Sequence, residues 1–179
     1  MAPKHHDALD FLDILADLRI DYALIGGVAV GFWSQERFTK DIDFTVALNE
    51  ALWLELEAYL KNSGDVRIDL IATDKENAPG LPYLIRLKFK EAFIDLIVSL
   101  TDFQKSLLQR KIPVDFSGKK IFIASPEDII VSKLIANRSQ DLVDIESLVT
   151  HLENLDSAYI EKWAREWDAL KTWTQISRR

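Results

Sequence analysis

The chain has 179 residues, 48% of them hydrophobic, and its 22 basic and 29 acidic side chains give a formal net charge of −7. No stretch approaches the roughly 20 consecutive apolar residues that a membrane-spanning helix requires, which excludes a membrane-embedded protein, and the lack of cysteine excludes disulfides and thiolate metal sites. The acidic balance argues against broad, sequence-independent binding to a nucleic-acid backbone.

The N-terminal part of the chain alternates between helical and extended patterns. Apolar residues at helical spacing predict a helix over residues 7–19, which Asp7 would cap. A short apolar strand over residues 22–25 runs into Gly26-Gly27, which opens a second helix toward Trp33. The elements that follow are a strand over residues 41–46, a helix over 50–61, a strand over 66–71 and a loop over 74–82.

Two hairpins are predicted in the middle of the chain. Their strands cover residues 83–89 with 93–98, turning at 90–92, and residues 112–116 with 119–123, turning at Ser117-Gly118; a helix over 102–110 lies between the hairpins. Between Leu84 and Lys120 the sequence holds eight basic and four acidic residues. This local positive balance fits either a surface for a polyanionic substrate or a solvated sheet edge.

The C-terminal part has the pattern of consecutive helices. Ser125 is a predicted N-cap, and Pro126 follows at the first helical position. The predicted helices cover residues 126–137, 139–152 and 157–173, and the last carries an aromatic stripe that would pack on the core: Tyr159, Trp163, Trp167, Leu170 and Trp173. We therefore expect an α/β (α+β) fold, with a mixed sheet and flanking helices over residues 1–124 and a short helical region packed on it over residues 125–179.

The most informative residues are Asp41 and Asp43, on the strand over residues 41–46. Alternate residues of a strand share one face, so these two carboxylates point the same way while Ile42 and Phe44 point into the core. Two like charges about 4 Å apart repel by roughly 4 kcal/mol at an effective dielectric of about 20, so a cation should sit between them. Paired carboxylates favour Mg²⁺ or Mn²⁺, which are hard cations that bind carboxylate oxygens together with substrate phosphates.

Gly26-Gly27 adds a second signal, because the pair lies where a strand passes into a helix. Glycine allows a phosphate to approach the backbone there, and a helix N-terminus favours negative charge. A tight turn would require the same residues, so the pair gains its meaning from the carboxylates that follow.

These segments together resemble the nucleotidyltransferase superfamily related to DNA polymerase β. Its pattern is an apolar residue with Gly-Gly or Gly-Ser, a spacer of about nine to thirteen residues, Asp-apolar-Asp/Glu-apolar, and later a third carboxylate between apolar residues. This chain has Ile25-Gly26-Gly27, then Asp41-Ile42-Asp43-Phe44, then Ile94-Asp95-Leu96. The segments RFTKDIDF (37–44) and ASPEDIIVSKLIANRSQDLVDI (124–145) look like the small bacterial nucleotidyltransferases akin to AbiEii-type toxins.

The resemblance implies a nucleotidyltransferase fold with a catalytic core over residues 1–124. It implies that Asp41, Asp43 and Asp95 are the metal-binding and catalytic carboxylates, with Mg²⁺ or Mn²⁺ as cofactor, and that Gly26 and Gly27 pack against the nucleotide phosphates. Asp69, in Ile68-Asp69-Leu70, competes for the third position by pattern alone. We prefer Asp95 because it follows a hairpin strand and leads into Leu96-Ile97-Val98, as in the family.

Four further residues are candidates for nucleotide binding. Lys133 interrupts an apolar helical stripe and must reach outward; it either covers the core with its stem or contacts the triphosphate, and the sequence leaves both readings open. Asp141 is implied by the resemblance, although an acidic residue at a helix start is also favoured by the helix dipole. Arg37 and Thr39 flank the Asp41 strand and could touch phosphate, or form a structural pair with an aspartate.

We therefore expect a metal-dependent enzyme that transfers a nucleoside monophosphate from a nucleoside triphosphate to a hydroxyl of a protein, RNA or small-molecule acceptor. A toxin–antitoxin pair with a cognate partner fits the resemblance. The alternative is a non-catalytic, nucleotide-binding partner or regulator with the same fold. Residues 1–10 carry no apolar segment typical of a signal peptide, so we expect a cytoplasmic protein without a membrane partner.

Overall fold

The computed structural model describes residues 3–35, 39–74 and 76–177. The helices of the described residues are α1 (Pro3–Asp17), α2 (Gly26–Trp33), α3 (Glu50–Asn62), α4 (Asp102–Arg110), α5 (Pro126–Ala136), α6 (Ser139–His151), α7 (Ser157–Glu166) and α8 (Leu170–Ile176). The strands are β1 (Tyr22–Ile25), β2 (Asp41–Val46), β3 (Val66–Thr73), β4 (Pro82–Phe89), β5 (Ala92–Val98), β6 (Ile112–Phe116) and β7 (Lys119–Ile123). None of the described helices is long and apolar enough to span a membrane.

The strands form one mixed sheet of seven strands in the order β3-β4-β5-β2-β1-β7-β6. Strand β2 runs parallel to β5 and β1 runs parallel to β7, while the other neighbouring pairs are antiparallel. The mixed α/β fold expected from the sequence is therefore confirmed. Apart from the first and last helices, the ends of the predicted elements are correct to within two residues.

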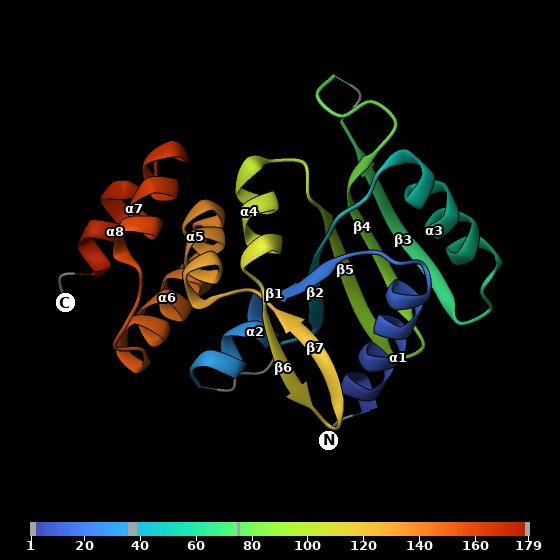
Figure 1. Cartoon of the computed structure of the whole chain (residues 1–179), viewed down its shortest axis with the longest axis horizontal. Coiled ribbons are helices and arrows are strands. Elements are labelled where there is room, and N and C mark those ends of the chain that lie inside the picture. Colours follow the sequence, from blue (N-terminus) through green and yellow to red (C-terminus); the bar gives the residue numbers. More distant parts are fainter. Residues whose placement is uncertain (1–2, 36–38, 75, 178–179) are drawn as a thin grey trace.

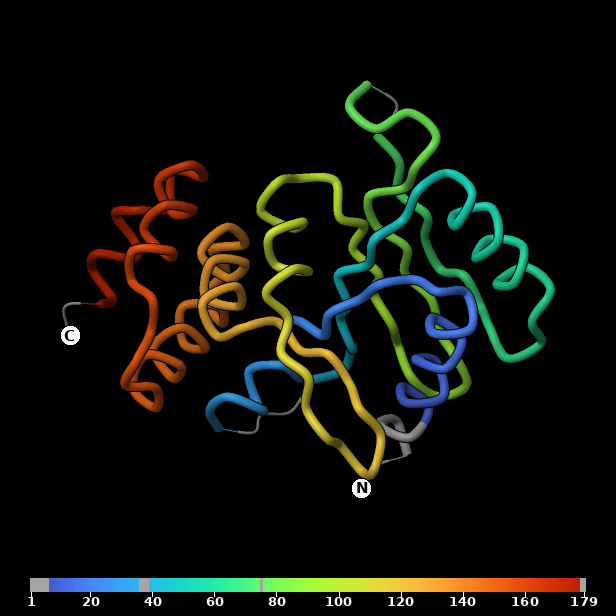
Figure 2. Tube along the Cα trace, viewed as in Figure 1, coloured from blue at the N-terminus to red at the C-terminus, as the bar shows by residue number. Residues whose placement is uncertain are grey.

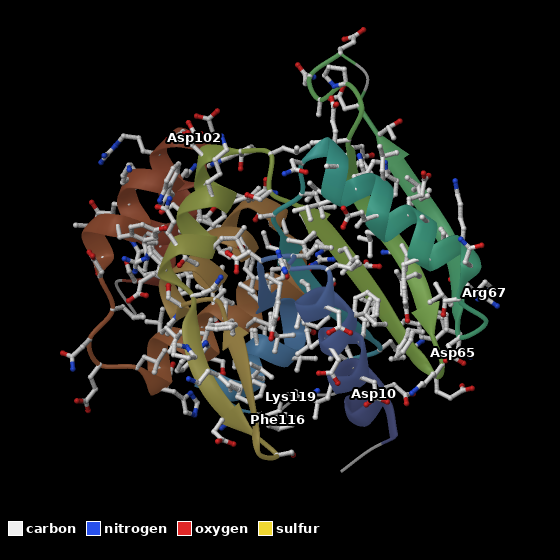
Figure 3. The ribbon with its side chains drawn as sticks, turned by 45° about the vertical axis from the view of Figure 1, so that its right-hand side comes forward. Asp10, Asp65, Arg67, Asp102, Phe116 and Lys119 are labelled. Carbon is white, nitrogen blue, oxygen red and sulfur yellow. The ribbon has the colours of Figure 1, made fainter. Side chains whose placement is uncertain are left out.

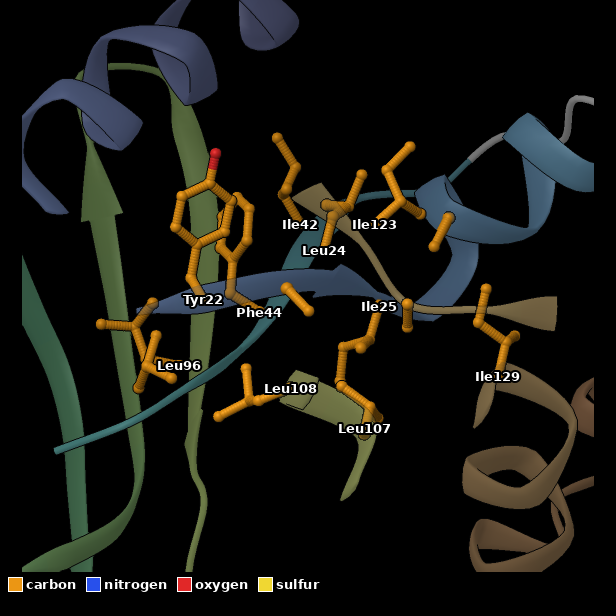
Figure 4. Close-up of a cluster of buried hydrophobic side chains, with 14 of the residues drawn as sticks. Tyr22, Leu24, Ile25, Ile42, Phe44, Leu96, Leu107, Leu108, Ile123 and Ile129 are labelled. Atoms are coloured by element: carbon orange, nitrogen blue, oxygen red, sulfur yellow. The ribbon is translucent and has the colours of Figure 1, made fainter. Parts of the chain in front are cut away.

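The core lies between the sheet and its helices. Phe44 and Leu96, at the centre of β2 and β5, are almost completely buried, and Figure 4 shows them with Tyr22 and Ile123 among the apolar side chains of neighbouring strands. Helices α1 and α3 lie in front of β3, β4 and β5 in Figure 1, and Phe11 of α1 meets Phe89 of β4 edge to face with ring centroids 5.5 Å apart. This packing fixes which face of the sheet carries polar side chains.

Helices α5 to α8 gather at the end of the molecule opposite α3 and β3 (Figure 1). The chain path in Figure 2 leaves β7 directly for α5 and stays in this helical part to the C-terminus. Ser125 caps α5 by accepting from the backbone N–H of Asp128 (3.2 Å), with Pro126 at the start of the helix, as the sequence predicts. The helical part thus begins at a defined N-cap.

The predicted start of the first helix is wrong. Helix α1 begins at Pro3, so Asp7 lies inside it and does not cap it. Its Oδ2 instead accepts from the backbone N–H of Glu91 (3.1 Å), in the turn between β4 and β5. The apolar periodicity begins only at Ala8, and it therefore gave no signal for the polar first turn.

The single helix predicted over residues 157–173 is two helices. Asp168 has a φ of +54°, and the backbone N–H of Ala169 bonds to the carbonyl of Ala164 (2.7 Å), which ends α7 before α8 starts. Trp163 and Trp173 are buried as expected, but Trp167 lies in the break and is 41% exposed. The aromatic stripe is therefore interrupted where the chain changes direction.

The basic residues between Leu84 and Lys120 are mostly neutralised by acidic side chains. Lys90 pairs with Asp10 (2.6 Å) and Lys119 with Asp13 (2.6 Å), which joins β4–β5 and β7 to α1; Figure 3 shows Asp10 and Lys119 near that helix. The other ion pairs of this segment are Arg86–Asp95, Lys88–Glu91, Lys105–Asp102, Arg110 with Glu127 and Asp128, and Lys111–Asp21. Seven of the eight basic residues between Leu84 and Lys120 thus form ion pairs within the fold. Their charge therefore stabilises contacts inside the protein and is already engaged when a polyanion approaches.

Candidate active site

The sheet brings Asp41, Asp43 and Asp95 together on one face. Strands β2 and β5 are parallel and in register, so that Asp43 lies directly opposite Asp95. Neighbouring strands are about 4.8 Å apart, and residues paired in a parallel ladder point to the same face. Ile94 and Leu96 point to the opposite, buried face, and Asp95 is itself only 7% exposed. Two strands that are distant in sequence thus build a compact carboxylate cluster.

Asp69, the rival for the third position, lies elsewhere. It is exposed on β3, the edge strand of the sheet, and two strands separate it from β2. Its carboxylate accepts from Arg67 (Nε–Oδ1 2.8 Å), and this hydrogen bond lowers the pKa of Asp69 below its usual range. The structure therefore places Asp95, and not Asp69, beside Asp43.

Gly26 sits directly against the carboxylate cluster, at the first residue of α2. Its φ is +68°, and a Cβ at this position would lie 2.0 Å from Oδ2 of Asp43. No larger residue fits while Asp43 keeps its position, so glycine is required both by the backbone conformation and by this contact. Gly27, the next residue, is buried. The N-terminus of α2 is thereby held next to Asp43.

The electrostatics of the cluster are most unfavourable at Asp43. Burial, followed by repulsion from Asp95 and Asp41, raises the pKa of Asp43 from 3.8 to about 6. The positive charges of Lys133 and Arg138 act in the opposite direction, and α2, whose first residue lies against Asp43, packs against both α5 and α6. The site therefore concentrates negative charge beside two cationic side chains.

This raised pKa predicts how stability depends on pH. Folding favours the protonated form of Asp43, so its contribution to the unfolding free energy is fully present below pH 4 and is lost as pH rises from about 4 to about 6. Asparagine does not titrate, so Asp43→Asn does not lose stability in this way. The difference in melting temperature between Asp43→Asn and the wild-type protein should therefore increase in favour of the variant as pH rises from about 4 to about 6. Melts in metal-free buffers from pH 4 to 7.5 test this, and a constant difference at every pH would contradict it.

Asp95 is held by an arginine that the sequence analysis did not identify. Arg86 on β4 lies directly opposite Asp95 in the antiparallel β4–β5 ladder. Its Nε donates to Oδ1 (2.8 Å) and its Nη2 donates to Oδ2 (2.6 Å), which is a bidentate ion pair. The turn predicted at residues 90–92 would pair Leu87 with Asp95, whereas the observed register pairs Phe89 with Ala92 and so brings Arg86 opposite Asp95.

Lys133 does not reach outward to solvent, which corrects the sequence-based expectation. It is 5% exposed, and its Nζ donates to Oδ1 of Asp141 (3.1 Å) and to Oδ2 of Asp144 (2.5 Å). Both aspartates are also buried, so the three residues form an ionic cluster that joins α5 to α6. Asp144 had no assigned role in the sequence analysis, because only packing shows its partner.

Arg138 extends this cluster toward the surface. Its side chain is 76% exposed, and it donates to Asp141 through Nε (2.7 Å to Oδ2) and Nη2 (3.2 Å to Oδ1). Burial alone would raise the pKa of Asp141, but the hydrogen bonds from Arg138 and Lys133 outweigh it and the pKa is lowered. Asp141 is thus ionised and fully engaged by cations at the start of α6.

Thr39 and Arg37, the two remaining candidates for phosphate binding, precede β2. Thr39 donates through Oγ1 to the backbone oxygen of Asp41 (3.2 Å), which braces the start of β2. Arg37 lies outside the described residues.

The carboxylate cluster has the donor chemistry of a divalent cation site. Carboxylate oxygens on adjacent strands suit Mg²⁺ or Mn²⁺. Burial raises the pKa of Asp43 most and repulsion from Asp95 and Asp41 raises it further, and a cation would offset that repulsion. In residues 3–35, 39–74 and 76–177, however, no three Asp, Glu or His side chains are already arranged as metal ligands. Both oxygens of Asp95 are engaged by Arg86 in this arrangement.

Comparison with known proteins places the chain among nucleotidyltransferases. The family model "Nucleotidyltransferase of unknown function (DUF6036)" matches residues 10–179, whereas no curated protein matches the chain significantly. ANT(2″)-Ia in complex with adenylyl-2″-tobramycin is similar in structure, with a TM-score of 0.61 and 14% identity over 92% of this chain and 98% of that chain.

Two further solved structures show the same likeness. The lincosamide antibiotic adenylyltransferase LnuA, bound to lincomycin, has a TM-score of 0.56 and 16% identity over 82% of this chain and 97% of that chain. An antigenic nucleotidyltransferase-like protein from Paracoccidioides brasiliensis has a TM-score of 0.53 and 20% identity over 93% and 88% of the two chains. At these identities the structural likeness shows a shared fold.

Proposed function

Because this chain belongs to the DUF6036 family of nucleotidyltransferases, we propose that it is an enzyme that transfers a nucleoside monophosphate from a nucleoside triphosphate to an acceptor hydroxyl. The observation that carries this proposal is the in-register pairing of Asp43 with Asp95, beside the glycine that opens α2. Three carboxylates next to a helix N-terminus provide oxygen ligands for a cation and a favourable position for phosphate.

Asp41 and Asp43 would hold Mg²⁺ or Mn²⁺, and Asp95 would complete the site. The bound cation would stabilise negative charge on the attacking and leaving oxygens. Asp95 accepts the proton of the acceptor hydroxyl while the hydroxyl oxygen forms a bond to the α-phosphorus. The bond from that phosphorus to the bridging oxygen breaks, and pyrophosphate leaves with the electron pair.

The phosphates would lie between α2 and the cationic side of α6. Gly26 and Gly27 let the triphosphate approach the backbone at the start of α2. Arg138 is exposed beside Asp141, and its positive charge would favour a phosphate on this side of the cluster. Lys133 contributes positive charge to the same field from its buried position.

We propose a small molecule with a hydroxyl group as the acceptor. Support comes from ANT(2″)-Ia and LnuA, which share the fold and are described in complex with adenylyl-2″-tobramycin and as a lincosamide antibiotic adenylyltransferase. Protein and RNA acceptors are the other outcomes of the assay below. The proposal of a toxin–antitoxin pair rests on the sequence resemblance of residues 37–44 and 124–145. The alternative function, a non-catalytic regulator with the same fold, would bind nucleotide without transferring it.

The test is incubation with each α-labelled nucleoside triphosphate, Mg²⁺ or Mn²⁺, and a lysate separated into small-molecule, RNA and protein fractions. Label should enter the small-molecule fraction. Asp95→Ala should slow transfer by about 10²–10⁴-fold, the usual contribution of a general base, and leave nucleotide binding largely intact. Asp69→Ala, on the exposed edge strand, should be nearly silent. The reverse pattern, or nucleotide binding with no transfer to any fraction, would refute the proposal.

A further inference from the structure

The ion pair between Arg86 and Asp95 has a geometry that bears directly on how a cation can enter the site. Arg86 uses two donors to hold both oxygens of Asp95, at 2.8 and 2.6 Å. The Arg86 side chain is 47% exposed, whereas that of Asp95 is 10% exposed. Asp95 is therefore the enclosed partner of the pair, and Arg86 is the partner that reaches solvent.

The pair also divides the charge of the cluster unevenly. Arg86 compensates Asp95 directly, whereas Asp43, its in-register neighbour on β2, lies against Gly26 at the start of α2. A cation held jointly by Asp43 and Asp95 would bind a carboxylate oxygen that already accepts a hydrogen bond from Arg86. Arg86 and a cation would thus compete for this carboxylate, since the guanidinium occupies one acceptor position on each oxygen and its positive charge repels a second cation.

We propose that Arg86 is a positioning residue that gates cation binding at Asp95. In the free protein it holds both Asp95 oxygens, and it gives up one of them when the nucleotide arrives with its cation. The proposal rests on the proposed function, because it takes Asp95 to be part of the cation site. The freed N–H donors of Arg86, which already reach solvent, can then meet an oxygen of the bound substrate.

A purely structural brace between β4 and β5 would have a different consequence. It would affect the free energy of unfolding but not the affinity for a cation. The edge strand offers a matched control, because Arg67 pairs with Asp69 in the same way (Nε–Oδ1 2.8 Å) and lies on the outer edge of the sheet in Figure 3. Removing Arg67 causes the same change in net charge without touching the carboxylate cluster.

The experiment is a titration with Mn²⁺ alone, followed by the electron paramagnetic resonance signal of free Mn²⁺. Arg86→Gln should lower the Kd for Mn²⁺ by about tenfold, within the usual range of coupling between two sites. Arg86→Lys, which cannot hold both oxygens, should give an intermediate Kd, and Arg67→Gln should bind as the wild-type protein does. In an Asp95→Asn background, Arg86→Gln should no longer change the Kd, because the competition acts through that carboxylate.

An unchanged Kd in Arg86→Gln or Arg86→Lys, or equal tightening in Arg67→Gln or in the Asp95→Asn background, would overturn the gating role. Failure of the proposed function would be distinguishable, since Arg86→Gln would then tighten Mn²⁺ binding while no fraction of the lysate accepted label. Thermal melts of each variant confirm that the compared proteins are folded.

Discussion

Replacing both Asp41 and Asp43 by asparagine is expected to slow nucleotidyl transfer on the order of 10⁴-fold, a loss typical of removing central catalytic groups. The reason is that these two carboxylates supply the negative charge and the oxygen ligands for which the site is built. The double variant should still fold, because it removes the buried charge and the carboxylate repulsion that together raise the pKa of Asp43. In metal-free buffer near pH 7 it should melt at a higher temperature than the wild-type protein.

The same variant tests the cation. Millimolar Mg²⁺ or Mn²⁺ with a non-hydrolysable triphosphate should raise the melting temperature of the wild-type protein by mass action, and the double variant should lose this shift. Asp65→Asn combined with Asp69→Asn is the matched control, because it removes the same charge from two exposed positions on the β3 side of the sheet, where Figure 3 shows Asp65. If the double variant of Asp41 and Asp43 showed the full increase in melting temperature, the cation would have to bind at another site.

The largest expected effect on stability is at Lys133. Lys133→Met should destabilise the protein by about 3–5 kcal/mol, because removing one partner of a buried ion pair leaves uncompensated charge in the interior. The methionine keeps most of the apolar stem, so the lost charge and not a cavity causes the loss. Asp141 keeps its bonds from Arg138, but Asp144 loses its hydrogen bond of 2.5 Å to the ammonium.

Denaturant unfolding of three variants measures this effect. Lys105→Met is the control, because Lys105 forms an exposed i,i+3 ion pair with Asp102, and its loss should cost less than about 1 kcal/mol. Adding Asp144→Asn to Lys133→Met should recover part of the lost stability, since it removes a buried negative charge that the ammonium neutralised. If Lys133→Met were as stable as Lys105→Met, the stabilising role of the buried Lys133 cluster would be contradicted. Titration of folded Lys133→Met with nucleotide tests separately whether the charge of Lys133 contributes to phosphate binding.

Local sequence was sufficient to predict much of the fold. The alternation in Asp41-Ile42-Asp43-Phe44 places the two acids on one face of a strand, because side chains of a strand point alternately to its two sides. The N-cap at Ser125 and the hairpins follow from short-range backbone preferences. The left-handed residue at Asp168, which divides the last helix, had no such signal, since a non-glycine residue there depends on its surroundings.

What the sequence alone determined is therefore the type of each element and the face on which Asp41 and Asp43 lie. Only the tertiary structure decided their neighbours: Asp95 in register with Asp43, Gly26 against the same carboxylate, Arg86 on Asp95, and Asp141 with Asp144 around Lys133. A period of two or 3.6 residues fixes the direction of a side chain relative to its own element. Strand order, register and helix packing fix which distant side chain it meets, and through burial they determine whether its charge lies in water or in the interior.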